Sequence, residues 1–523
     1  METINFSPKV YNHLSQYNHI LFQMKLPLQI GILIDSSDPV WTFNEVMEGV
    51  NLSKYLKVNK LGREPYNPFM MLKVILFSEM LGGMSLRQLE SSCKTDIRFM
   101  FLANEETPSH TAFANFINNR LSKNIRDIFL DVNAYIIEKD SVDTSVIYID
   151  GTKMEANANK YTFVWKKTAI KTRDRKFAEV KDIFDTLNNN YSYSIIYSND
   201  ISLELIDQVI SSIILSINND NIEIVYKQGK PKTPIQRLLD KLVACLFKLY
   251  ECIDKIDICG ENRNSYSKTD QGATMMHMKE DYYAGTNLFK PGYNVQLGIS
   301  DEYIMDVLVC QDRNDQGTLE PFLENYKSAY GDIPEKIVAD AGYGSYDNYM
   351  YLTLNKRDLY IKFSSYSIEK SAKYKRKKYR KNNWARDDKG NYICPAGHTT
   401  KFLYDSKNTK GRYYRVNQTL GTGKCSECPL KSECTKAIGD RLITHNPILE
   451  EFENKVRENL SGEEGQKLKD NRSSQSEGAF GIIKSNNGKI RFRRRGMNLV
   501  TLEMTLVCIG FNLMKYHNKK NRH

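Results

Sequence analysis

The sequence has few of the features that mark secreted, membrane-spanning or disulfide-rich proteins. Its 523 residues include only 10 cysteines and 3 tryptophans, and we find no run of about 18 uncharged apolar residues. The first twenty residues lack the order of basic, apolar and small residues that makes a signal peptide. Ten cysteines in so long a chain do not suggest a disulfide framework. We therefore expect a soluble cytoplasmic protein that does not bind membranes.

What the chain does have is enough apolar sequence for several cores and a modest excess of positive charge. Apolar residues make up 41% of it, which suits roughly two to four domains. The net charge is +11, from 74 Lys and Arg against 63 Asp and Glu. Two basic runs favour a polyanion such as nucleic acid, although a solvated loop face explains either run alone equally well. The runs are Lys373, Lys375, Arg376, Lys377, Lys378, Arg380 and Lys381, and then Lys484, Lys489, Arg491, Arg493, Arg494 and Arg495.

Residues 1–140 read as a helical domain. Pro68 begins one apolar-faced helix, and Ser85 and Ser109 can cap two more. Three short helices with tight turns are compatible with a helix-turn-helix DNA reader, although such triplets also occur in bundles that bind nothing. The last helix would offer these side chains to base edges: His110, Thr111, Asn115, Asn118 and Asn119.

Two short apolar segments each end in an aspartate followed by a glycine turn. The first runs from Ser145 to Asp150, and the second from Glu335 to Asp340. Between them, after a helical segment at 165–285, the alternating stretch Tyr293–Val309 predicts an antiparallel hairpin, and a helix follows at 316–330. This order of strand, hairpin, helix and strand is that of a ribonuclease H-like core. It would place the two aspartates on adjacent strands of one mixed sheet.

A third acidic residue comes late in the chain, in the helical segment 471–484. Helical spacing would place Glu477, Phe480, Gly481 and Lys484 on one face. Two glycines inside a helix each cost about 1 kcal/mol relative to alanine, so we expect close approach of a sheet or a phosphate chain there.

Two aspartates and a glutamate that converge can hold two Mg²⁺ or Mn²⁺ ions, because hard cations prefer oxygen ligands. Such a metal pair activates water or a 3′-hydroxyl for attack on a phosphodiester and stabilises the leaving oxygen. Lys484, and also Arg472 before the glutamate, could hold a phosphate beside the metals. The alternative is that Asp150, Asp340 and Glu477 are ordinary turn and surface residues.

Four motifs in this order resemble those of bacterial insertion-sequence transposases of the DDE class, most of all the insertion sequence 1182 group. They are Asp150–Tyr161, Pro291–Gln296, Ala339–Ser345 and Glu477–Lys484. The resemblance implies a ribonuclease H-like core, Mg²⁺ dependence and action on double-stranded DNA at terminal inverted repeats. It assigns Asp150, Asp340 and Glu477 to the metal triad. Related enzymes often carry an arginine four residues before the glutamate, where this chain has Ser473.

A cysteine cluster lies just after the first basic run. Cys394, Cys425, Cys428 and Cys434 include one CxxC pair and predict a structural Zn²⁺ site, with His398 as a possible substitute ligand. Reduced, unliganded thiols are the alternative. Family members with a similar insert show such a cysteine pattern, which makes ligation by the four cysteines our first choice.

The sequence thus predicts an α/β protein with a ribonuclease H-like core, a helical insertion and a Cys-rich zinc-binding insertion. The predicted parts are a helical DNA-end-binding domain at 1–140, core segments at 141–164, 286–368 and 441–523, the helical insertion at 165–285 and the Cys-rich insertion at 369–440. The predicted activity is cleavage at element ends and transfer of the 3′ ends to target DNA. An inactive DNA-binding derivative and a nuclease that only hydrolyses are the alternatives. We expect a homodimer or higher assembly on DNA, at the bacterial nucleoid.

Overall fold

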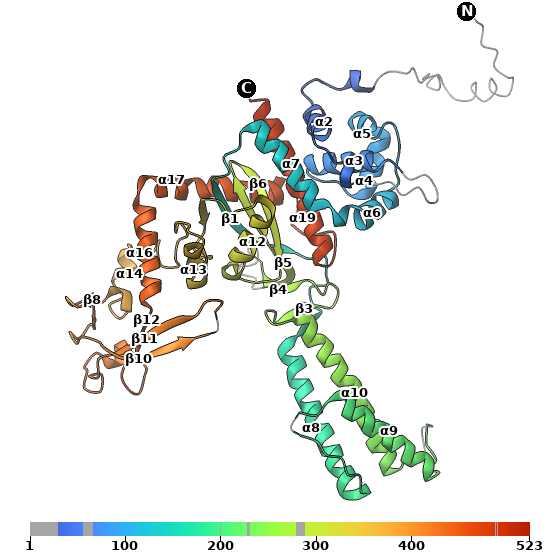
Figure 1. Cartoon of the computed structure of the whole chain (residues 1–523), viewed down its shortest axis with the longest axis vertical. Helices are drawn as coiled ribbons and strands as arrows, with labels where there is room; N and C mark the ends of the chain where they lie inside the picture. The colour runs from blue at the N-terminus through green and yellow to red at the C-terminus, as the bar shows by residue number, and fades with distance from the viewer. Residues whose placement is uncertain are drawn as a thin grey trace, which may run out of the picture. The chain divides into compact units, whose positions relative to one another are not determined.

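A computed structural model gives the fold of the chain (Figure 1). It describes residues 30–55, 66–198, 200–226, 231–278, 288–409, 411–486, 488 and 490–522. The chain divides into two compact units. One comprises Met1–Tyr135 with Leu513–His523, and the other comprises Ile136–Asn512.

The first unit is helical in its described part, as the sequence predicts. Asn67, Ser85 and Ser109 accept hydrogen bonds from the first-turn amides of three helices, so the predicted starts are confirmed. The structure adds a short helix, α5, which is capped by Asp96. Tilted phenylalanine rings form the centre of the core. The helices are α2 (Pro39–Gly49), α3 (Pro68–Met80), α4 (Leu86–Thr95), α5 (Ile97–Leu102), α6 (His110–Asn119) and α7 (Ile125–Asp140), of which α7 continues into the second unit.

A five-stranded mixed sheet is the centre of the second unit. Its main order is β6-β5-β1-β7, and β4 also pairs with β5. β1 lies antiparallel to β5 and parallel to β7, while β5 and β6 form the predicted hairpin. The prediction of a mixed sheet with helices is therefore confirmed. The strands are β1 (Val146–Glu155), β4 (Thr274–His277), β5 (Phe289–Ser300), β6 (Tyr303–Cys310) and β7 (Lys336–Ala339).

The inner strands of the sheet carry apolar side chains that are buried in the protein. Ile147 and Ile149 of β1 are fully buried. The parallel pair needs a crossover connection, which runs from β6 through helix α12 (Leu319–Tyr330) to β7. Phe322 of α12 presses on the sheet beside Ile147 where β5 has Gly298, which leaves room for the ring.

The helical insertion is a long helix pair with a third helix packed on it (Figure 1). Buried aliphatic and aromatic side chains join α8 (Lys166–Tyr191), α9 (Leu203–Asn219) and α10 (Pro234–Cys259) in a core of their own. Short strands β2 (Phe163–Trp165) and β3 (Ser265–Ser267) pair at its base. The predicted helical range of 165–285 was too long, because β4 at Thr274–His277 belongs to the main sheet.

The Cys-rich insertion contains small sheets and two single-turn helices. Its strands are β8 (Ala385–Arg386), β9 (Tyr392–Ile393), β10 (Lys401–Asn408) and β11 (Arg415–Gly421), and its helices are α14 (Ala372–Lys375) and α15 (Lys431–Cys434). β12 (Ile443–His445) pairs with β11, so the small sheet extends past the predicted boundary at residue 440. The remaining α-helices in the described ranges are α13 (Tyr346–Leu354), α16 (Pro447–Ser461), α17 (Glu463–Arg472), α18 (Gly478–Gly481) and α19 (Met497–Lys520).

Among the described residues, α19 is long and apolar enough to cross a membrane by length and composition alone. Its mean hydropathy is 1.5 over the best window, and 72% of that window is buried inside the protein. The core helix of a globular protein meets the same criterion. This helix is therefore weak support for a membrane span.

Gly298 gives a direct test of how tightly α12 packs on the sheet. A Cβ at Gly298 would stand 2.5 Å from the ring of Phe322 and 2.6 Å from Ile147, whereas a Cβ at Gly317 would meet no atom within 4 Å. We expect Gly298→Ala to lower the free energy of unfolding by roughly 1–3 kcal/mol, and Gly317→Ala to change it by less than about 0.5 kcal/mol. Urea unfolding of both variants measures this. Equal effects would contradict the packing described.

Candidate active site

Asp150 lies in β1 at the point where the parallel pairing with β7 ends. Ile149 is the last β1 residue opposite a β7 residue, Ala339. On its other side β1 continues antiparallel to β5 as far as Glu155, with Asp150 opposite Leu297, so the predicted glycine turn after Asp150 was wrong. The Asp150 carboxylate accepts a hydrogen bond of 3.0 Å from the amide of Gly151. Two neighbouring strands therefore fix the backbone at this aspartate.

Asp340 is the residue that follows β7. Because Ile149 pairs with Ala339, the residue that follows each of them is an aspartate, and the two aspartates lie next to each other where the β1–β7 pairing ends. The Oδ1 atom of Asp340 accepts a 2.7 Å hydrogen bond from the amide of Gly342, which holds the turn after the strand. The structure thus brings together the two aspartates that the sequence singles out.

The proximity of these carboxylates changes the acidity of Asp150. The pKa of Asp150 is raised to about 6, mainly by burial and then by the charge of Asp340, with a smaller rise from Asp315, whereas Arg472 and the Gly151 amide act in the opposite direction. Like charges held together disfavour ionisation of one of them. The site therefore concentrates negative charge that a cation would stabilise.

Asp315 is the site residue that sequence reasoning missed. It begins the short 3₁₀ turn Asp315–Gly317 between β6 and α12. Its Oδ1 accepts hydrogen bonds from Asn294 Nδ2 at 2.7 Å and Gln296 Nε2 at 3.0 Å. The one available signal in the sequence was the pair Asn294 and Gln296 in the otherwise apolar β5 segment. Both side chains are at most 1% exposed, and buried amides need a hydrogen-bond partner from elsewhere in the chain.

Gly151 and Gly342 leave room for the Asp315 side chain to approach the backbone beside Asp150 and Asp340. A Cβ at Gly151 would stand 2.4 Å from Gln296 Nε2 and 2.7 Å from Asp315 Oδ1. A Cβ at Gly342 would stand 2.9 Å from Asp340 Oδ1 and 3.7 Å from Asp315 Oδ2. Asp315 and Asp340 thus face one small space at the end of the sheet. A side chain at either glycine would displace them.

The C-terminal helices bring basic residues to the same sheet. Arg472 ends α17, and its charge opposes the rise in the Asp150 pKa, so it lies near that carboxylate. The ammonium of Lys484 donates to the backbone oxygen of Lys153, three residues beyond Asp150 on β1, at 3.3 Å. The backbone of Glu477 belongs to a π-helical turn, Ser473–Glu477, that contacts β1 and β5. The Glu477 side chain lies outside what the structure describes.

The predicted single face of the 471–484 helix was wrong. Two π-helical turns, Ser473–Glu477 and Ile482–Asn486, interrupt the regular repeat, so Phe480 is buried while Gly481 is exposed. Among the described residues, no atom would lie within 4 Å of a Cβ at Gly478 or Gly481. These glycines therefore do not serve close packing on the sheet.

The donor set fits a hard divalent cation. Asp150, Asp340 and Asp315 present only carboxylate oxygens, which Mg²⁺ and Mn²⁺ prefer, and no cysteine or histidine takes part in the contacts described above. As they stand, no three His, Cys, Asp or Glu side chains in the described ranges lie close enough together to hold a metal ion. The carboxylates would have to move together to ligate one.

The four clustered cysteines line one cavity of about 30 Å³, together with His398. The Arg441 guanidinium donates to Cys434 Sγ at 2.9 Å, and the Arg441 amide donates to Cys425 Sγ at 3.5 Å. All four residues are half-buried free cysteines. The insertion thus brings the predicted ligands to one place, although the metal-site geometry is absent from the described residues.

The two basic runs differ in what their side chains do. Lys373, Lys375 and Lys377 are exposed. By contrast, Arg491 donates to the backbone oxygens of Ala156 and Ala158, and Arg495 donates to that of Asn157. These arginines fix the loop after β1. The second run is thus partly structural, and Lys489 lies outside the described residues.

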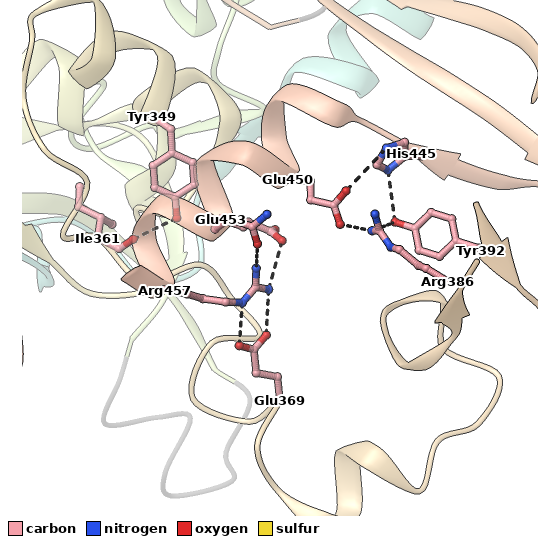
Figure 2. A network of polar contacts seen from close by, with 10 residues as sticks. Tyr349, Ile361, Glu369, Arg386, Tyr392, His445, Glu450, Glu453 and Arg457 are labelled. Carbon is pink, nitrogen blue, oxygen red and sulfur yellow. Dashed lines mark hydrogen bonds and ion pairs between the residues drawn. The ribbon is translucent and has the colours of Figure 1, made fainter. Parts of the chain in front are cut away.

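A network of charged and aromatic side chains ties the Cys-rich insertion to α16 (Figure 2). Arg457 of α16 bonds both oxygens of Glu369 at 3.1 and 3.2 Å. Arg457 also lies 3.7 Å from Glu453 of the same helix. Glu450 of α16 pairs with Arg386, whose guanidinium also lies 4.3 Å from the ring of Tyr392. Because α16 leads to α17, the insertion is anchored on the helices that end at Arg472.

In the first unit, the polar residues predicted to read DNA are exposed on α6. His110, Thr111, Asn115, Asn118 and Asn119 all face solvent. His110 is also held within the unit, because its backbone amide and ring Nδ1 lie 2.9 and 2.7 Å from Glu90 of α4. These contacts lower the pKa of Glu90 to about 2.

Comparison with known protein families yields two matches. Residues 393–517 match the transposase DDE domain, and residues 29–119 match the transposase domain DUF772. Two segments of the chain are thus similar to transposase domains. The DDE match covers the four clustered cysteines, Arg472, Glu477 and Lys484, whereas Asp150 and Asp340 precede it. A DDE transposase domain implies a ribonuclease H-like core and catalysis with divalent metal, and the assignment to one insertion-sequence group is not supported further. No curated protein and no solved structure matches the chain.

The raised pKa of Asp150 predicts how stability depends on pH without divalent ions. Between about pH 4 and 6 the folded protein keeps a proton on Asp150 that the unfolded chain has released, so stability falls as pH rises through this range. We expect Asp150→Asn to remove a fall of up to roughly 3 kcal/mol. Urea unfolding in chelator across this range measures it. Asp312→Asn, at an exposed carboxylate, should keep the fall, and an unchanged slope in Asp150→Asn would contradict the burial described.

Proposed function

We propose that the protein is an active DDE transposase that cleaves DNA at the terminal inverted repeats of its element and joins the 3′ ends to target DNA. The observation that carries this proposal is the adjacency of Asp150 and Asp340 where two parallel strands pair, in a chain with two segments that match transposase domains. Their carboxylates, with Glu477, would hold two Mg²⁺ or Mn²⁺ ions. When bound, these ions would supply Lewis-acid stabilisation of charge on the phosphodiester oxygens.

The basic residues near the sheet have positioning roles in this proposal. Arg472 lies near Asp150, and Lys484 reaches the backbone of β1 beyond it. Both could hold a phosphate of the DNA beside the carboxylates, as charged donors to phosphate oxygens do. No described residue has an atom within 4 Å of where a Cβ of Gly478 or Gly481 would stand, which leaves room for a phosphate chain against the helix.

The charge distribution supports double-stranded DNA as the partner. Residues 369–440 contain 18 Lys and Arg against 7 Asp and Glu, an excess that equals the whole net charge of +11. We assign this Cys-rich insertion to contact with the DNA backbone and residues 1–140 to binding of the element ends. The core parts at 141–164, 286–368 and 441–523 would carry the chemistry. Two ends must react together, so we propose a homodimer or higher assembly on DNA, in the cytoplasm at the nucleoid.

Cleavage and strand transfer on DNA that carries the element's ends test this proposal. We expect nicking and joined products with Mg²⁺ or Mn²⁺, and a loss of at least about 100-fold in Asp340→Asn and Glu477→Gln, because each removes one metal-holding charge. Glu335→Gln changes an exposed carboxylate at the other end of the β7 region and is the matched control.

The outcomes separate the alternatives. Binding of the ends with wild type and variants equally inert would indicate an inactive DNA-binding derivative. Metal-dependent hydrolysis without joined products would indicate a nuclease. Equal losses in Glu335→Gln and Asp340→Asn would reject the assignment of the carboxylates.

We also propose that the four clustered cysteines bind a structural Zn²⁺. They line one cavity, and N–H groups of Arg441 donate to two of the sulfurs, as donors around metal-bound thiolates do. His398 lines the same cavity and could replace one cysteine. A zinc site would stabilise an insertion whose strands and helices are short.

Metal analysis of the full chain, purified without chelator, tests the zinc proposal. We expect about one zinc per chain, and near-complete loss in Cys428→Ser. Cys245→Ala, at a buried cysteine of the helical insertion, should keep the zinc. A wild-type protein without zinc, or equal content in both variants, would contradict the proposal.

A further inference from the structure

Asp315 occupies a position that the proposed triad leaves unexplained. It lies on the connection between β6 and α12, outside the three motifs that supply Asp150, Asp340 and Glu477. Its side chain is half-buried at the same end of the sheet. Asp315 could either stabilise the turn between β6 and α12 or take part in the proposed metal site.

Two buried amides fix one oxygen of this carboxylate. Asn294 and Gln296 are 1% and 0% exposed, and both donate to Oδ1. The Gln296 side-chain oxygen in turn accepts the hydroxyl of Tyr343, which follows Asp340 in the chain. The network therefore joins Asp315 to β5 and to the loop that carries Asp340. A carboxylate held this way cannot turn freely toward solvent.

The other oxygen is directed toward the site. Among the described residues, no hydrogen-bond donor reaches Asp315 Oδ2. The position that a Cβ on Gly342 would occupy lies 3.7 Å from this atom and 2.9 Å from Asp340 Oδ1. No lysine or arginine forms an ion pair with Asp315 in the described ranges. A carboxylate oxygen that is immobilised, lacks a donor and lies beside a second carboxylate is suited to a cation.

We infer that Asp315 is a further metal-holding carboxylate, which acts with Asp150 and Asp340 through its Oδ2 atom. This inference rests on the proposed two-metal site and extends it. Asn294 and Gln296 are positioning residues, because they fix the orientation of Asp315 without facing the metal space themselves. A metal bound there would have the charge of three aspartates on the sheet end in addition to Glu477.

Metal binding without DNA tests the inference apart from catalysis. Titration calorimetry of the full chain with Mn²⁺ near neutral pH should show binding at least about 10-fold weaker in Asp315→Asn than in wild type. The asparagine keeps the shape of the side chain and can still accept the two amide hydrogen bonds. Asp312→Asn, three residues earlier on the same connection, should bind Mn²⁺ as wild type does.

A measurement on the wild-type chain avoids any folding defect of the variant. Fe²⁺ bound in place of Mg²⁺, with ascorbate and peroxide, should cut the polypeptide next to the ion, near residues 150, 315 and 340. Cuts near 150 and 340 without one near 315, or equal Mn²⁺ affinity in Asp315→Asn and wild type, would overturn the inference. Full DNA cleavage by the wild type alongside either result would leave the proposed function in place.

Discussion

The parallel pairing of β1 with β7 is the constraint on which the rest of the site depends. Because Ile149 and Ala339 are partners, the aspartates that follow them must leave the sheet side by side. Their repulsion raises the pKa of Asp150 beyond what burial alone would do. The sheet is buried and packed against α12, so it keeps the carboxylates together in spite of their electrostatic repulsion. A bound cation would offset this repulsion.

The amides of β5 complete this arrangement from the neighbouring strand. Asn294 and Gln296 are buried in an otherwise apolar strand, where unpaired polar groups are costly, and both are satisfied by Asp315. The same network reaches the loop after Asp340 through Tyr343. Three chain segments that are distant in sequence thus fix one another's side chains around the sheet end.

The sequence predicted the parts of this site that follow a local pattern. A short apolar run followed by Asp and Gly identified Asp150 and Asp340, although only Asp340 comes at the end of its strand, because β1 continues through Gly151 to Glu155. The alternation of Tyr293–Val309 identified the hairpin. Asp315 could not be found in this way, because it stands in a 3₁₀ turn with no periodicity and its partners come from another strand. The face of the 471–484 helix was mispredicted, since π-helical turns leave no mark in a 3.6-residue pattern.

The strand pair at the base of the helical insertion makes the length of the insertion independent of the geometry of the carboxylates. Trp165 and Ser265, which flank the insertion, are paired neighbours in β2 and β3, so nearly a hundred residues leave the core and return at one point. Helices α8 and α10 can therefore lengthen or shorten by whole turns without moving the strand ends. The length of the helical insertion and the geometry of the carboxylates are thus independent features of the fold.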